Sequence, residues 1–173
     1  MIRDIAEIGG MRLNKHVAHS GVCSRMQAGD YVKDGLVGVN GEVQKDPSYQ
    51  IKEWDVVTFR GKEIRPSAQF VYLLLNKPKG VITTLSDDRG RKPVMDILGD
   101  TTPQRVFPVG RIDRDTTGLL LLTNDGYLAK RLMHPTHQVP KVYKATLDKP
   151  LSKSDLQQIV DGLTLEDGPV KVN

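Results

Sequence analysis

The chain has 173 residues, of which 38% are hydrophobic and 27% charged, with a formal net charge of +4 and a single cysteine, Cys23. This composition is ordinary for a folded protein, excludes an intramolecular disulfide, and includes no run of the roughly 18 apolar residues that a membrane helix needs. Because the first ten residues also lack the apolar core of a signal peptide, we expect a cytoplasmic protein with no membrane partner.

The positive charge is concentrated in the middle of the sequence. Residues 1–66 carry 10 basic and 9 acidic side chains, whereas residues 77–144 carry 12 basic and 7 acidic ones. The last 29 residues carry 3 basic and 5 acidic side chains. A basic middle favours a polyanionic partner, most commonly nucleic acid, although an ordinary solvated surface with scattered lysines would give the same count.

Residues 11–60 predict a small unit of two helices packed on a short sheet. In the first helix, Leu13 and Val17 share one face. Ser24 is a favourable N-cap for the second helix. The dipeptide Asn40-Gly41 favours a two-residue type I′ turn between two short strands.

The segment 61–70 is polar, contains Pro66, and predicts a linker. Beyond it, strands and helices are interspersed without regular βαβ alternation, which indicates the α+β class. We expect strands at "VYLLLN", at "GLLLLT", whose continuous apolar run is typical of burial on both faces, and at "KVYKATL". Helices are predicted at "PVMDIL", after Asn124, and after the N-cap Ser152.

Metal binding and thiol chemistry have little support in the sequence. The histidines form two pairs with i, i+3 spacing, His16 with His19 and His134 with His137. A zinc site needs four suitable ligands, and with one cysteine and no acidic cluster beside either pair we expect no metal. We expect Cys23 to be a packed residue rather than a nucleophile, which would need a base and an electropositive pocket.

Cations gather around two glycine-containing turns that follow the first long strand: Lys77, Lys79, Arg89, Arg91 and Lys92. Such turns free backbone N–H groups and the cations attract oxyanions, so the pattern suits phosphate contacts. Neither G-x-x-x-x-G-K-[ST] nor G-x-G-x-x-G occurs, so a nucleotide-binding loop is not predicted. Mobile surface charge is the alternative interpretation.

The stretch "VGRIDRDTTGLLLLTNDG", residues 109–126, places aspartates and arginines directly before four leucines. A carboxylate kept ionised at the edge of a core would be a suitable nucleophile or base. Asp113 and Asp115 lie on one short segment, which seldom provides the separation that paired acid and base carboxylates need. From the chemistry alone, a structural salt bridge with Arg111 or Arg114 is the simpler interpretation.

Several ordered motifs resemble those of ribosomal RNA pseudouridine synthases. "GRIDRDTTGLLLLT" is similar to the signature G-R-[LI]-D-x-x-T-T-G-L-L-L-L-T of the branch that includes small-subunit enzyme A and large-subunit enzymes B, E and F. "YLLLNKPKGVITT" and "KVYKATL" resemble two further motifs of that branch. "RLNKHVAHSGVCSR" and "GLVGVNGEV" resemble the S4 RNA-binding domain that commonly precedes the catalytic domain.

The resemblance covers nearly the whole chain from residue 11 and implies an α+β architecture. After an N-terminal extension, residues 1–10, it implies a small S4-like α/β module at 11–60 and a linker at 61–70. A mixed, mainly antiparallel catalytic domain would follow at 71–173, incomplete at its C-terminal end.

The activity implied by the resemblance is isomerisation of a specific uridine of ribosomal RNA to pseudouridine, without a cofactor. Asp113 would be the catalytic aspartate, Arg111 would pair with it and help to extrude the nucleotide, and Tyr143 would stack against the uracil. Attack on C1′, attack on the ring and removal of the 2′ proton all stay open. "LEDGP" and the S4-like module favour large-subunit RNA and the enzyme B type, with the enzyme A type next; a non-catalytic RNA-binding protein is the alternative.

Extruding a base costs a few kcal/mol, which phosphate contacts offset. The resemblance and the basic turns together give these expected RNA contacts: Arg12, Lys15, Ser24, Arg25, Lys77, Lys79, Arg89 and Arg91. Two positions depart from the family pattern, Met26 in place of a basic residue and Pro140 in place of a charged one.

Family members continue for several tens of residues beyond "LEDGPVKVN", with a strand pair and a basic segment that contributes to the active site. We therefore expect the 173-residue chain alone to have little or no activity. We expect a monomer, although an open strand edge would allow dimerisation.

Overall fold

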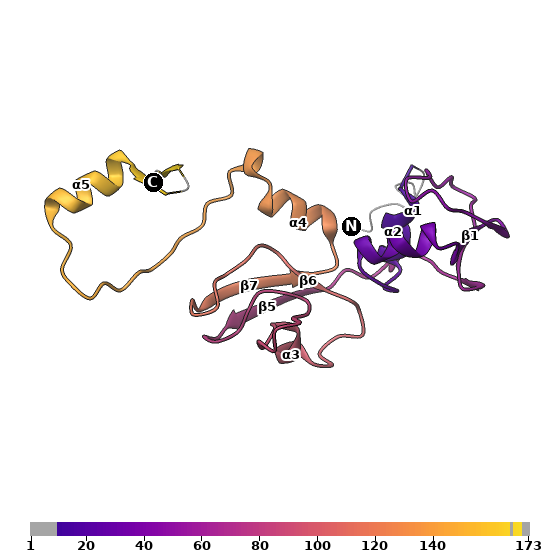
Figure 1. The fold of residues 1–173 in the computed structure, drawn as a ribbon, viewed down its shortest axis with the longest axis horizontal. Helices are drawn as coiled ribbons and strands as arrows, with labels where there is room; N and C mark the ends of the chain where they lie inside the picture. The colour runs from indigo at the N-terminus through magenta and orange to yellow at the C-terminus, as the bar shows by residue number, and fades with distance from the viewer. Residues whose placement is uncertain (1–9, 167, 171–173) are drawn as a thin grey trace. The chain divides into compact units, whose positions relative to one another are not determined.

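The computed structural model of the protein describes residues 10–166 and 168–170 (Figure 1). By its internal contacts the chain divides after Gln138 into a first unit and a second unit that starts at Val139. Helices and antiparallel strands occur together, which confirms the predicted α+β class. Among the described residues, the helices are all too short or too polar to cross a bilayer.

The first unit begins with the two predicted helices, α1 (Leu13–His19) and α2 (Arg25–Lys33). Leu13 and Val17 are buried on the inner face of α1, as their spacing predicts. Ser24 caps α2 through a capping box: its Oγ accepts from the backbone N–H of Gln27 at 3.2 Å, and its own N–H donates to the Gln27 side chain at 3.0 Å. The predicted cap is confirmed.

A four-stranded antiparallel sheet with the order β2-β1-β3-β4 packs against these helices. Its strands are β1 (Val37–Val39), β2 (Glu42–Val43), β3 (Val57–Phe59) and β4 (Lys62–Glu63). Asn40 and Gly41 have φ values of 54° and 86°, which confirms the type I′ turn. Because β4 pairs with β3, this sheet continues into the segment expected to be a linker.

A second antiparallel sheet, with the order β5-β7-β6, carries the motif residues. It contains β5 (Tyr72–Lys77), β6 (Phe107–Pro108) and β7 (Gly118–Thr123), and it is accompanied by α3 (Met95–Leu98), α4 (Gly126–Met133) and the 3-10 helix η2 (Pro135–His137). One face packs on a core that includes Val94, Val106, Leu120 and Leu122. The long strands β5 and β7 and the helices α3 and α4 were predicted, whereas β6 was not.

The prediction that "GLLLLT" is buried on both faces is wrong. Leu120 and Leu122 are buried, but Leu119 is 71% exposed. Alternate residues of a strand point to opposite faces, and the core cluster packs on only one of them. Leu74 of the neighbouring strand is also exposed, so the outer apolar side of this strand pair lies open.

The second unit contains α5 (Lys153–Asp161) and a hairpin of β8 (Leu163–Leu165) and β9 (Gly168–Val170). Ser152 caps α5 as predicted, its Oγ accepting from the N–H of Asp155 at 3.0 Å. The strand predicted at 141–147 is wrong, since this segment is irregular. Alternation of side chains is not sufficient for a strand, which also needs a hydrogen-bonded neighbour, and no described strand pairs with this segment.

Candidate active site

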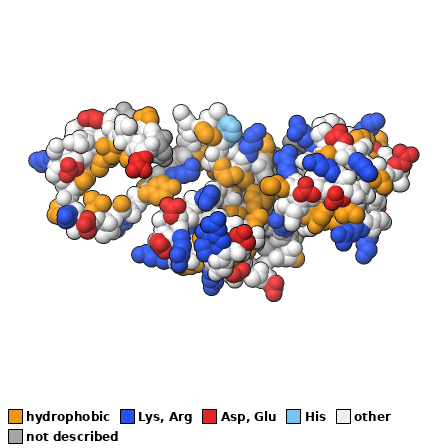
Figure 2. Space-filling model, in the orientation of Figure 1, with side chains coloured by type: hydrophobic (Ala, Val, Ile, Leu, Met, Phe, Trp, Pro, Cys, Tyr) orange, Lys and Arg blue, Asp and Glu red, His pale blue; other side chains and the backbone are white. Residues whose placement is uncertain are grey.

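Asp113 lies on the loop that joins β6 to β7, and its side chain is exposed. The preceding residue, Ile112, packs against the core cluster that contains Leu120. The carboxylate therefore stands at the edge of the leucine core and in contact with solvent. Figure 2 shows Lys and Arg side chains gathered over the end of the sheet where β5 finishes and β7 begins.

Arg114, the residue after Asp113, is hydrogen-bonded to residues at the end of β5 and just beyond it. The carbonyl oxygen of Arg114 accepts a hydrogen bond from Lys77 Nζ at 3.1 Å and another from the backbone N–H of Gly80 at 2.9 Å. These bonds connect parts of the chain that lie more than 30 residues apart. They fix the backbone on the C-terminal side of the aspartate.

The residue before Asp113 is held by Thr83. The hydroxyl of Thr83 donates to the carbonyl oxygen of Ile112 at 2.8 Å and accepts from its N–H at 3.1 Å. Within the loop, the N–H of Thr116 donates to the carbonyl oxygen of Asp113 at 3.2 Å. The backbone is thus restrained on both sides of Asp113 while the carboxylate projects outward.

The expected RNA contact at Lys77 is wrong, because this residue is 0% exposed. Its ammonium donates to the carbonyl oxygens of Pro78 and Val81, each at 2.9 Å, as well as to Arg114. An ammonium has three donors, and all three are used here. Strand periodicity could have indicated this burial, since Leu73, Leu75 and Lys77 fall on one face of β5. Thr83 had no comparable indication in the sequence.

The expected pairing of Arg111 with Asp113 is not formed. Within residues 10–166 and 168–170, the ion pairs are Arg65 with Glu63 and Arg91 with Asp87. The simpler interpretation, a structural salt bridge at Asp113, is therefore wrong as well. An exposed carboxylate without such a partner can meet a substrate.

Tyr143, the expected stacking residue, belongs to the second unit. It lies in the irregular segment around residues 141–147 and is 70% exposed. Its role in the site stays a prediction.

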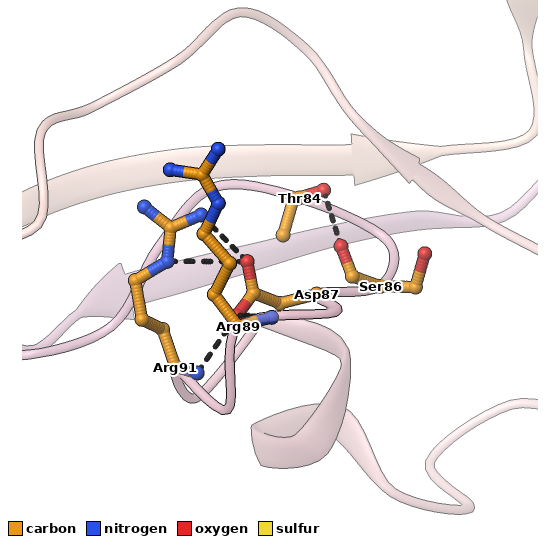
Figure 3. Close-up of polar contacts among 5 residues, drawn as sticks. All are labelled: Thr84, Ser86, Asp87, Arg89 and Arg91. Carbon is orange, nitrogen blue, oxygen red and sulfur yellow. Dashed lines mark hydrogen bonds and ion pairs between the residues drawn. The ribbon is translucent and has the colours of Figure 1, made fainter.

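Two arginines on the loop before α3 are bonded to an aspartate that the sequence did not single out. Asp87 accepts from the backbone N–H groups of Arg89 and Arg91 and from the Arg91 guanidinium (Figure 3). The hydrogen bonds from Arg91 are the main cause that lowers the pKa of Asp87 to about 2. Arg89 and Lys79 are exposed.

In the first two helices, Arg12 and Arg25 are exposed and Lys15 is half-buried. Burial, and after it the positive charges of Lys15 and Arg25, lower the pKa of His19, which indicates that these cations lie close to that helix face. The Ser24 hydroxyl oxygen serves as the helix cap, so its RNA contact stays a prediction.

Cys23 is buried, and burial raises the pKa of its thiol, which agrees with a packed residue rather than a nucleophile. In the part of the chain that the structure describes, no group of three or more His, Cys, Asp or Glu residues could hold a metal ion.

Comparison with known proteins shows the family to which the chain belongs. Residues 71–166, more than half of the chain, match the family model described as RNA pseudouridylate synthase. The chain belongs to this synthase family. Residues 11–57 match the S4 domain, so the order of an S4 domain followed by a synthase domain, implied by the motifs, is confirmed.

Curated relatives support the assignment to the synthase family. The chain is 43% identical over 157 residues to ribosomal large subunit pseudouridine synthase B of Bacillus subtilis, covering 91% of this chain and 64% of the relative. It is 41% identical over 163 residues to an uncharacterized RNA pseudouridine synthase of Aquifex aeolicus, covering 93% of this chain and 65% of the relative. The chain therefore spans a little less than two thirds of the length of these relatives.

A solved structure supports the fold. The crystal structure of a pseudouridylate synthase matches with a TM-score of 0.54 and 28% identity, covering 93% of this chain and 70% of that chain. The synthase fold is thus shared along most of the sequence.

Proposed function

We propose that the protein isomerises a uridine of ribosomal RNA to pseudouridine, with Asp113 as the catalytic aspartate and with no cofactor. The main support is the exposure of the Asp113 carboxylate, together with the hydrogen bonds that hold its backbone. Its carboxylate is exposed and has no ion-pair partner among the described residues, while its backbone is restrained through Thr83 and Lys77. A carboxylate in this setting is available as a nucleophile or a base.

RNA is the substrate class that the rest of the chain supports. The S4 domain and the exposed cations Arg12, Arg25, Lys79 and Arg89 suit contacts to a phosphate backbone. The name of the Bacillus subtilis relative favours large-subunit RNA. Such a substrate agrees with the cytoplasmic location expected from the sequence.

The test is tritium release from ribosomal RNA labelled at C5 of uridine, using the complete product of the gene. We expect release by the wild type and by Asp115→Ala, a matched change on the same loop, and none by Asp113→Ala. Equal release by Asp113→Ala would remove the catalytic assignment. No release by any form, with RNA binding retained, would instead favour a non-catalytic RNA-binding protein.

A further inference from the structure

The side chain of Asp87 is largely covered although it lies on a surface loop, with 4% of it exposed. The carboxylate accepts four hydrogen bonds. Two come from the backbone N–H groups of Arg89 and Arg91, at 3.0 and 2.7 Å, and two come from Nε and Nη2 of Arg91, at 3.1 and 2.6 Å. One acidic side chain therefore fixes the backbone of both arginines and the orientation of one guanidinium.

The two arginines remain able to bind an external anion. Arg91 is about half-exposed and uses only Nε and Nη2 on Asp87, so other N–H groups of its guanidinium are free of that carboxylate. Arg89 is exposed, and its side chain has no hydrogen bond or ion pair to any other described residue. In Figure 3 both side chains extend in the same direction, away from α3.

Phosphate is the anion that suits this arrangement. Planar guanidinium groups bind phosphate oxygens through paired hydrogen bonds, and a loop that is already ordered loses less entropy when it binds. With Asp87 neutralised by Arg91, the remaining charges of the loop are Asp88, Arg89 and Lys92, which sum to a positive charge.

From these contacts we propose that Asp87 is a positioning residue for RNA binding, which presents Arg89 and Arg91 to the phosphate backbone. This inference rests on the proposed function, because ribosomal RNA supplies the phosphates. It makes an acidic residue necessary for binding a polyanion.

The test separates positioning from simple charge. Asp87→Asn and Asp88→Asn remove the same negative charge from adjacent positions, and Asp88 is an exposed residue that accepts no side-chain hydrogen bond from the described residues. Charge alone predicts that both variants bind RNA more tightly. Positioning predicts that Asp88→Asn binds equally or more tightly, whereas Asp87→Asn binds about tenfold more weakly. The salt dependence of Asp87→Asn should also be shallower, by about 0.7 in log–log slope per lost phosphate contact.

The measurement is fluorescence anisotropy with transcribed large-subunit ribosomal RNA at several salt concentrations, using the complete gene product and Arg89→Gln as a test of the loop itself. If Arg89→Gln binds RNA more weakly but Asp87→Asn does not, the loop contacts RNA and the positioning role of Asp87 is overturned. Unchanged binding by Arg89→Gln would remove the loop from the RNA interface and overturn the inference, while tritium release would still report on the proposed function. If Asp87→Asn melts below Asp88→Asn, the two variants are compared at a temperature at which both are folded. Binding by Asp87→Asn as tight as that by Asp88→Asn would then overturn the inference.

Discussion

The buried ammonium of Lys77 donates a 3.1 Å hydrogen bond to the carbonyl oxygen of Arg114, the residue that follows Asp113. The last residue of β5 thereby supports the loop on which the proposed catalytic aspartate stands. An ammonium in the interior is costly unless its donors are satisfied, and three carbonyl oxygens satisfy them here. Lys77 is a structural part of the site rather than an RNA contact.

Replacement of Lys77 by Met should destabilise the protein. The change removes the side-chain donor from the carbonyl oxygens of Pro78 and Val81, while that of Arg114 keeps only the N–H of Gly80, and we expect a loss of about 2 kcal/mol in the free energy of unfolding. Lys79→Met, at an exposed position on the same turn, should change it by less than about 0.5 kcal/mol. Urea denaturation of both variants measures the difference, and equal stabilities would contradict the structural role.

Thr83→Val should slow the reaction without weakening RNA binding. Valine keeps the shape but loses both hydrogen bonds to Ile112, so the aspartate is held less firmly and kcat should fall on the order of tenfold to a hundredfold. Thr83→Ser retains the hydroxyl and should restore most of the rate. The measurement is pseudouridine formation under steady-state conditions at several RNA concentrations, which gives kcat and KM.

Thr102→Val is a suitable control for Thr83→Val, since among the described residues the Thr102 hydroxyl bonds only to Gln104 within its own loop. Its kcat and KM should match those of the wild type. If Thr83→Val raises KM and leaves kcat unchanged, Thr83 contributes to RNA binding rather than to the positioning of Asp113.

The stability of the first unit should fall in mild acid because of His16. This side chain is 4% exposed, and its burial lowers the pKa of the imidazole, although Nε2 lies 3.3 Å from the carbonyl oxygen of Ile64. Below the ordinary value of about 6.5, the unfolded chain takes up the proton more readily than the folded one. The free energy of unfolding should therefore decrease as the pH falls from about 6.5 toward the lowered pKa.

Denaturation of the wild type and of His16→Gln at pH 7.5 and pH 5.5 checks this expectation. The variant should lose less stability between the two pH values than the wild type does. His137→Gln, which removes an exposed imidazole, should behave as the wild type. An unchanged pH dependence in His16→Gln would show that another group causes the acid sensitivity.

The features that sequence reasoning predicted correctly are mostly local. Ser24 and Ser152 cap helices through groups three residues away, and Asn40-Gly41 forms its turn from its own backbone preferences. The apolar run GLLLLT was sufficient to predict the strand β7, because the run can be read from consecutive residues of the sequence. The open outer face of that strand was not predictable, since it depends on what packs against the sheet.

The motif around Asp113, the helix caps, the hairpin turn and the membership of the synthase family all follow from the order of the amino acids. The burial of Lys77, the bonds by which Thr83 and Lys77 restrain residues 112 and 114, and the bonds of Asp87 to Arg89 and Arg91 became visible in the folded chain. The irregular course of residues 141–147 also became visible there. Hydrogen bonds between segments 29 and 37 residues apart depend on which backbone groups the folded chain brings together, whereas caps and turns depend on a few neighbouring residues.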